Sequence, residues 1–180
     1  MSKESKTKVI TGKIRLSYAN IWKPKSINGG DPKYSASLII PKSDTKTLDQ
    51  INTAIECAKQ DGKGKWGGKI PPVLKLPLRD GDEERPDDEA YKNSYFINAT
   101  SATPPGVVDR DRNEIIDPSE MYSGVYARAS VNFYAFNANG NKGIACGLNN
   151  LQKWCDGDPL SGRANAADDF ATDIEEDFLS

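Results

Sequence analysis

The segment SGVYARASVNFYAFN, residues 123–137, alternates two kinds of side chain over its whole length. One set of alternate positions is small and apolar: Val125, Ala127, Ala129, Val131, Phe133 and Ala135. The other set is polar, cationic and aromatic: Tyr126, Arg128, Ser130, Asn132, Tyr134 and Phe136. A period of two is typical of a β-strand, because successive side chains point to opposite faces. The small apolar set suits the narrow interior of a small β-barrel.

Other segments show the same period and predict further strands. Residues 8–20 place Ile10, Ile14, Leu16 and Tyr18 on one face and Lys13, Arg15 and Ser17 on the other. Residues 33–41 alternate with Tyr34, Ala36, Leu38 and Ile40 on one face, and residues 93–102 predict another strand. After an Asn-Gly turn, IACGLNNL is expected to pair back with 123–137 as a hairpin.

Residues 45–60 change to the period of a helix. Leu48, Ile51, Ile55 and Ala58 recur at steps of three and four, Ser43 or Asp44 is a candidate N-cap, and Gly62 is a candidate stop. Five or six short strands with one inserted helix predict a mainly β protein, an OB-fold-like five-stranded partly open barrel. We assign it to residues 1–156 and expect 157–180 to be a flexible acidic tail; the order of the strands stays open.

Charge is unevenly distributed along the chain. All 24 Lys and Arg lie at or before Arg163, so the body carries about +4, whereas the tail carries six carboxylates and no cation. Such asymmetry indicates a body that binds an anionic partner. The tail also keeps two aromatic residues, Phe170 and Phe178, which a purely solubilising segment does not need.

Several chemistries are disfavoured by the residue types present. The chain has no His, so the usual general base and His-dependent nucleophile pairs are missing, and we expect no enzyme. The chain has three widely spaced cysteines, Cys57, Cys146 and Cys155. An odd number at wide spacing argues against a disulfide framework and against a zinc site. The acidic segment 79–89 is expected to be a solvated loop, with a Mg²⁺-dependent nuclease as the enzymatic alternative. We expect no cofactor and no metal.

The start of the chain and its hydropathy bear on location. MSKESKTKVI has no apolar stretch of the kind found in a secretion signal, and no apolar run approaches the length of a membrane span. With three cysteines and no sign of a disulfide framework, the sequence predicts a reduced, cytoplasmic protein. Whether the protein forms a homodimer stays open.

The polar set of 123–137 resembles a surface for unpaired bases. Aromatic rings interleaved with cations stack on bases and neutralise phosphates. Two turn-rich loops, IWKPKSINGGDP and GKGKWGGK, add Trp and Lys, although either Trp could pack under its own loop. The alternatives are that another element covers this face, or that it docks a protein. The candidate DNA-binding residues are Lys13, Arg15, Trp22, Lys23, Lys25, Lys63, Lys65, Trp66, Tyr126, Arg128, Tyr134 and Phe136.

The acidic tail fits the same hypothesis. A segment of charge −6 tethered to a basic groove competes with nucleic acid at high effective concentration, and once displaced it can bind partner proteins. The candidate partner-binding residues are Asp168, Asp169, Phe170, Asp173, Glu175, Glu176, Asp177 and Phe178.

Several motifs, in this order, resemble a family of bacteriophage single-stranded DNA-binding proteins: KIRLSYANIWKPK, YSASLIIPKSDTKT, LPLRDGDEERPD, YSGVYARASVNFYAFNANGNKGIACGLNNLQKW and a terminal DDF pattern. The resemblance implies an OB-like fold similar in plan to the T7-type phage proteins, with a role in replication and recombination of phage DNA. It also implies an acidic tail whose terminal aromatic residue recruits partners. Here Leu179 and Ser180 follow Phe178, which departs from that pattern.

Overall fold

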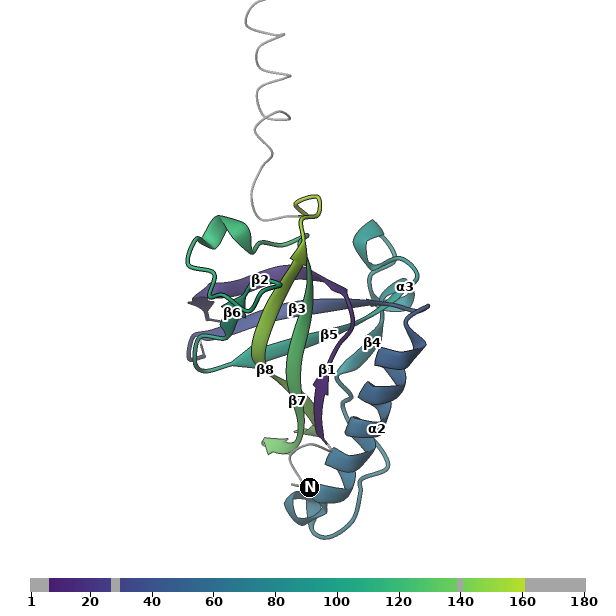
Figure 1. The fold of residues 1–180 in the computed structure, drawn as a ribbon. Helices are drawn as coiled ribbons and strands as arrows, with labels where there is room; N and C mark the ends of the chain where they lie inside the picture. The colour runs from purple at the N-terminus through teal and green to yellow at the C-terminus, as the bar shows by residue number, and fades with distance from the viewer. Residues whose placement is uncertain (1–6, 27–29, 139–140, 161–180) are drawn as a thin grey trace, which may run out of the picture.

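A computed structural model describes residues 7–26, 30–138 and 141–160. Within these ranges, eight strands form one sheet, shown in Figure 1. The strands are β1 (Lys8–Ile10), β2 (Ile14–Lys25), β3 (Lys33–Pro41), β4 (Leu78–Asp80), β5 (Ser94–Ser101), β6 (Gly106–Val108), β7 (Tyr126–Ala138) and β8 (Asn141–Cys155). The helices are α2 (Thr45–Asp61) and α3 (Gly81–Glu84), with 3₁₀ turns η1 (Lys63–Trp66), η2 (Glu89–Tyr91) and η3 (Pro118–Glu120).

Five of the strands close into a barrel. Their order is β2-β3-β5-β8-β7, and β7 pairs with β2 to complete the circle. Neighbours are antiparallel except β5 and β8, which run parallel. The β7–β2 seam is short, with Ile14 opposite Ala127 and Arg15 opposite Tyr126. This is a five-stranded Greek-key barrel of the OB type, so the predicted fold class is confirmed.

The alternation of β7 is as predicted. Ala127, Ala129, Val131, Phe133 and Ala135 are all buried, whereas the residues between them are partly or fully exposed. The hairpin partner is β8, whose register runs from Tyr126 opposite Cys155 to Ala138 opposite Asn141. Small side chains from β7 leave room inside the barrel for larger ones such as Leu16, Leu38 and Ile97.

Helix α2 lies between β3 and β5 in the chain and covers one side of the barrel, as Figure 1 shows. Of the two candidate caps, Asp44 is the N-cap, and its carboxylate accepts a hydrogen bond from the Thr47 N–H at 3.2 Å. At the other end the Gly62 N–H donates to the Ala58 carbonyl at 2.9 Å. The apolar stripe of Leu48, Ile51, Ala54, Ile55 and Ala58 is buried against the barrel.

The first predicted strand differs from the structure. The strand is interrupted between β1 and β2, and the pairing of β2 with β3 has an irregular register between Ser17 and Asn20. Each irregularity inverts the order of side chains, so Ile10 and Tyr18 are exposed while Val9 and Ser17 are buried. Strand β2 also continues to Lys25, through the segment that the sequence analysis assigned to a loop.

The acidic segment 79–89 also differs from the expected solvated loop. Together with the residues up to Tyr91 it forms β4, α3 and η2 and covers the outer surface of β3 and β5. The Tyr91 ring meets Phe96 edge-on, with centroids 5.1 Å apart, and its hydroxyl donates to Ser37 Oγ at 3.0 Å. Lys42 lies 3.0 Å from Asp80 and 2.9 Å from Asp82, which offsets two of the carboxylates.

In the part of the chain that the structure describes, no helix is both long enough and apolar enough to cross a membrane.

Candidate nucleic-acid interface

The outward residues of β7, here called the β7 face, are Tyr126, Arg128, Ser130, Asn132, Tyr134 and Phe136. Within the described residues no helix or second sheet lies over Tyr134, whose side chain is 42% exposed. The neighbours on β8 are small: Tyr134 lies opposite Ala145, and its Cε1 lies beside Gly147, which has no side chain. Small neighbours on β8 therefore leave this ring open to a stacking partner.

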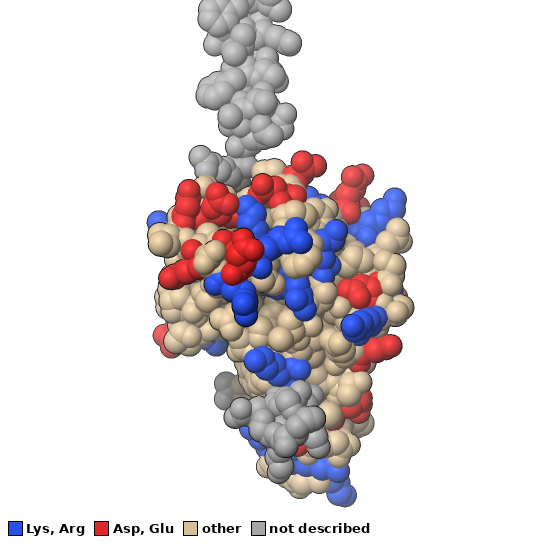
Figure 2. All heavy atoms as spheres, in the orientation of Figure 1, with Lys and Arg blue, Asp and Glu red and all other residues tan. Residues whose placement is uncertain are grey.

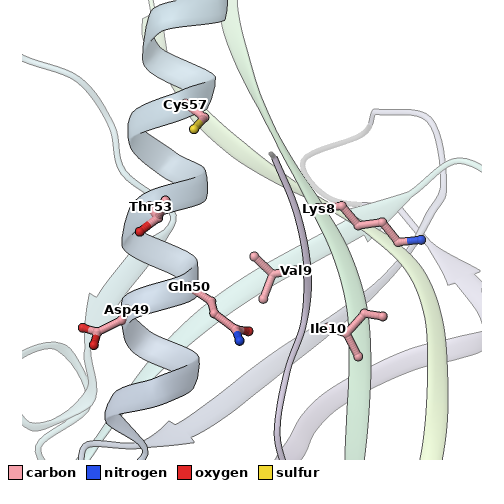
Figure 3. A pocket seen from close by; sticks show the side chains of 7 residues that line it. All are labelled: Lys8, Val9, Ile10, Asp49, Gln50, Thr53 and Cys57. Atoms are coloured by element: carbon pink, nitrogen blue, oxygen red, sulfur yellow. The ribbon is translucent and has the colours of Figure 1, made fainter. Parts of the chain in front are cut away.

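Strand β1 widens the β7 face on one side. Lys8 pairs with Asn132 and Ile10 with Ser130, and both side chains are exposed. Figure 3 shows Val9 directed towards α2 and Lys8 and Ile10 directed away from it. A hollow of about 660 Å³ separates β1 from α2 and is lined by Lys8, Val9, Ile10, Asp49, Gln50, Thr53 and Cys57. The sequence analysis did not assign Lys8 to the interface.

At the start of β7, three predicted residues meet. Lys13 Nζ lies 5.5 Å and Arg15 Cζ 5.4 Å from the centroid of the Tyr126 ring. The two cations differ in their other contacts. Arg15 donates from Nε to the Gly124 carbonyl at 3.1 Å and from Nη2 to the Asp158 carbonyl at 2.8 Å. Lys13 is exposed and has no hydrogen bond to any described residue, so its ammonium is available to a phosphate.

Arg128 follows Tyr126 near the start of the β7 face. Its Nε donates to the Thr11 carbonyl at 3.0 Å, which fixes the side chain across the break between β1 and β2. Tyr134 and Arg128 project to the same side because they are six positions apart on one strand. The two residues thus combine a stacking surface with a positioned guanidinium.

At the end of β7, the predicted loop residues are tied to the strand. Trp66 is buried and donates from Nε1 to the Phe136 carbonyl at 3.0 Å, while Lys65 Nζ donates to the Ala135 carbonyl at 2.9 Å. Trp66, which the sequence analysis placed in a loop as a candidate DNA-binding residue, therefore lies in the core. It packs in the core cluster that contains residues of α2 and β7, and β7 is distant from it in sequence. Lys63 and Lys65 are exposed beside it.

Trp22, Lys23 and Lys25 lie at the far end of β2, away from the β7 face. Trp22 is half-buried and donates from Nε1 to the Met121 carbonyl at 3.0 Å. Lys25 lies directly opposite Lys33 across the β2–β3 pair, and both are exposed. Like charges directly opposite are destabilising, so an anionic partner would relieve this pair.

The predicted DNA-binding cations form no ion pairs within the described residues, unlike several other cations of the chain. Lys42, Lys59, Arg79 and Lys153 form ion pairs within the described residues, and none of the predicted DNA-binding cations does. Figure 2 shows Lys and Arg gathered over the upper part of the face seen in Figure 1, with Asp and Glu above them and on both sides. The predicted cations that have no ion-pair partner here are Lys13, Arg15, Lys23, Lys25, Lys63, Lys65 and Arg128.

The segment after β8 packs on the body as far as the structure describes it. The Leu160 N–H donates to the Ser123 carbonyl at 3.0 Å, and the Gly157 N–H donates to the Tyr122 hydroxyl at 3.2 Å. A Cβ at Gly124 would collide with the Asp158 carbonyl, so a side chain there would displace the segment. Residues 157–160, expected to belong to the tail, thus contact the barrel; the eight predicted partner-binding residues lie outside the described ranges.

The described residues also bear on metal binding and on the reactivity of the cysteines. No group of three or more His, Cys, Asp or Glu suited to a metal ion occurs within residues 7–26, 30–138 and 141–160. The three cysteines all lie in these ranges and are free thiols. Burial raises the pKa of the Cys146 thiol well above its usual value, which makes it unreactive.

An OB-type barrel with an exposed aromatic ring and unpaired cations along one face defines the class of proteins that hold single-stranded nucleic acid. The chain belongs to the Enterobacter phage Enc34 single-stranded DNA-binding protein family, whose model matches residues 7–179. This confirms the resemblance predicted from the sequence.

The chain is also similar to individual phage proteins. Putative protein p50 of Acyrthosiphon pisum secondary endosymbiont phage 1 is 30% identical over 188 residues, covering 96% of this chain and 99% of that protein. The single-stranded DNA-binding protein of bacteriophage Enc34, solved in complex with ssDNA, superposes with a TM-score of 0.77 at 26% identity, covering 89% of this chain and 96% of that one. The gp2.5 single-stranded DNA-binding protein of bacteriophage T7 shares the fold, with a TM-score of 0.63 at 17% identity over 94% and 95% of the two chains.

Proposed function

We propose that this chain is a non-enzymatic protein that coats single-stranded DNA without sequence preference during replication and recombination of phage DNA in the host cytoplasm. The observation that carries the proposal is the open ring of Tyr134, 42% exposed, on the same strand face as Arg128. The binding of ssDNA by the Enc34 relative supports it.

The DNA lies along the β7 face. Tyr126, Tyr134 and Phe136 stack on bases, which is sequence-tolerant because every base has a π-face. The thirteen residues of β7 span roughly 40 Å, which suits the 4–16 nucleotides that an OB fold covers. Phosphates are neutralised by Lys13, Arg128, Lys63 and Lys65, with Lys8 added from β1. Arg15 and Trp66 also hold the barrel together, because Arg15 donates through Nε and Nη2 to two backbone carbonyls and Trp66 donates through Nε1 to one.

The acidic tail acts as a competitor and a recruiter. Its six carboxylates lie at positions 168–177, and the chain that carries them leaves the body at the segment that Arg15 holds through the Asp158 carbonyl. DNA that occupies this face displaces the tail, which then presents Phe170 and Phe178 to replication or recombination proteins.

The test is a titration of the full-length protein with oligo(dT) and with a duplex of the same length. We expect strong preference for the single strand, and an affinity that falls with salt with a log–log slope near −0.7 per phosphate neutralised. Equal affinity for the two ligands would refute stacking as the basis of binding. Intact DNA after incubation with Mg²⁺ is expected as well, whereas degradation that EDTA prevents would identify a nuclease.

A further inference from the structure

Tyr18 is a large aromatic side chain that the alternation of β2 assigned to the core, yet it is 49% exposed. Its φ is 47°, in the left-handed region that bulky residues rarely adopt. It lies where the β2–β3 register shifts between Ser17 and Asn20. The bulge turns the ring outward, away from the barrel interior.

Neighbouring groups hold this conformation in place. Asn20 donates from Nδ2 to the Tyr18 carbonyl at 3.2 Å, and the Ala19 N–H donates to Ser123 Oγ at 2.9 Å. Glycine adopts a positive φ without strain, so nothing in the backbone favours tyrosine at position 18. Strained residues of this kind persist where the surroundings fix them, and they occur often at binding sites.

A hollow of about 540 Å³ lies beside Tyr18, here called the Tyr18 hollow. Its lining holds one cation and no carboxylate: Tyr18, Ala19, Asn20, Lys25, Met121, Tyr122 and Ser123. Lys25 and the opposed Lys33 are exposed and without ion pairs among the described residues. Arg85 does not line this hollow but lies 5.6 Å from the centroid of the Tyr18 ring, which places a cation on the ring as well.

We propose that the Tyr18 hollow is a subsite for one unpaired nucleotide of single-stranded DNA, with the base stacked on Tyr18 and its phosphate held by Lys25 and Lys33. This inference rests on the proposed function and adds a position outside the β7 face. Ser123, which lines the hollow, precedes Tyr126 by three residues, so a short segment of the chain joins the hollow to the β7 face.

Three variants at one position separate stacking from folding. Tyr18→Phe keeps the ring and should bind oligo(dT) within about twofold of the wild type, whereas Tyr18→Ala should lose about 5- to 160-fold, as expected for one stacked base. Tyr18→Gly should lose as much affinity, but its melting temperature should equal or exceed that of the wild type, because glycine relieves the strained φ. If the ring had a structural role instead, Tyr18→Gly would lower both the affinity for oligo(dT) and the melting temperature.

The ligands provide the second control. On an abasic strand of the same length, Tyr18→Ala should bind as the wild type does, because only base contacts are lost. Lys25→Ala should flatten the salt dependence by up to about 0.7, one phosphate's worth, whereas Lys46→Ala on the exposed side of α2 should leave the slope unchanged.

If Tyr18→Ala bound oligo(dT) as tightly as the wild type, the subsite would be overturned and the proposed function would stand. An equal loss on oligo(dT) and on the abasic strand, or a lower melting temperature for Tyr18→Gly, would overturn it too. Failure of the wild type itself to prefer oligo(dT) over duplex would instead refute the proposed function.

Discussion

Arg15 donates a hydrogen bond from Nη2 to the carbonyl oxygen of Asp158 at 2.8 Å and so ties β2 to the segment that follows β8. The same guanidinium lies on the Tyr126 ring next to Lys13. Two cations at one ring therefore have different tasks: Arg15 holds backbone together, and Lys13 is free for DNA.

The first prediction follows from this difference. Lys13→Ala should weaken DNA binding, flatten the salt slope by up to about 0.7 and change the free energy of unfolding by less than about 0.5 kcal/mol. Arg15→Ala should lower the free energy of unfolding by about 1–3 kcal/mol, because two hydrogen bonds from a charged group are lost. Thermal melts and titrations over a range of salt measure both quantities. An unchanged slope for Lys13→Ala would exclude it from the phosphate contacts.

The second prediction compares two aromatic residues: Tyr134, which is exposed on β7, and Trp66, which is buried in η1 beside the same strand. Tyr134→Ala should reduce the free energy of binding to oligo(dT) by about 1–3 kcal/mol with little change in melting temperature. Trp66→Ala should instead reduce the free energy of unfolding by about 3–5 kcal/mol, because it leaves a cavity between α2 and β7. Denaturation curves measure the loss of stability in each variant. Titrations with oligo(dT), at a temperature where both variants are folded, measure the loss of affinity. A large stability loss for Tyr134→Ala would mean that its ring supports the fold.

Local patterns were sufficient for the main elements of the fold and for the central strand of the site. The alternation of β7 predicted its inner and outer faces, and the apolar spacing with Asp44 and Gly62 predicted α2, because both signals lie within one element. The exposure of Tyr18 depends on a bulge fixed by Ser123, more than a hundred residues away. The burial of Trp66 and the cover of β3 and β5 by Tyr91 likewise depend on contacts between distant segments. No local period carries that information.

The third prediction concerns acid pH. Lys153 lies 2.8 Å from Asp156, and the Tyr122 hydroxyl donates to the same carboxylate at 3.0 Å. The hydrogen bond from Lys153, then that from Tyr122, lowers the pKa of Asp156 below its usual 3.8. A carboxyl group whose pKa is depressed by folding stabilises the fold above its unfolded pKa, and this contribution is lost as the pH falls through the folded pKa.

Asp156→Asn should therefore melt at a lower temperature than the wild type near neutral pH, and the difference should shrink as the pH falls below about 4. Melting temperatures of both proteins across that range provide the measurement. Asp49→Asn, at an exposed position on α2 without an ion pair in the described structure, is the matched control. A difference that stays constant down to the lowest pH would show that the ion pair does not contribute.

The last prediction concerns the acidic tail, which carries six carboxylates and two phenylalanines. Tethering to the segment at Leu160 keeps the tail near the body at an effective concentration of roughly 1 mM. If the tail binds the body with a Kd of about 0.1 mM, competition weakens DNA binding about tenfold; with a Kd of about 1 mM the factor is about two. The competition is electrostatic and therefore weakens as salt screens the charges.

A variant ending at Arg163 should bind oligo(dT) more tightly than the full-length protein at low salt, and the two affinities should converge at high salt. A full-length variant with the six carboxylates replaced by amides is the matched control: it should bind like the truncated protein, because it keeps the length of the tail and loses only its charge. Both variants should coat DNA yet fail to recruit replication or recombination proteins. Phe170→Ala with Phe178→Ala should separate the two roles, keeping most of the electrostatic competition while weakening recruitment. Equal affinity of the truncated and full-length proteins at low salt would rule out competition and leave the tail as a partner-binding or solubilising segment.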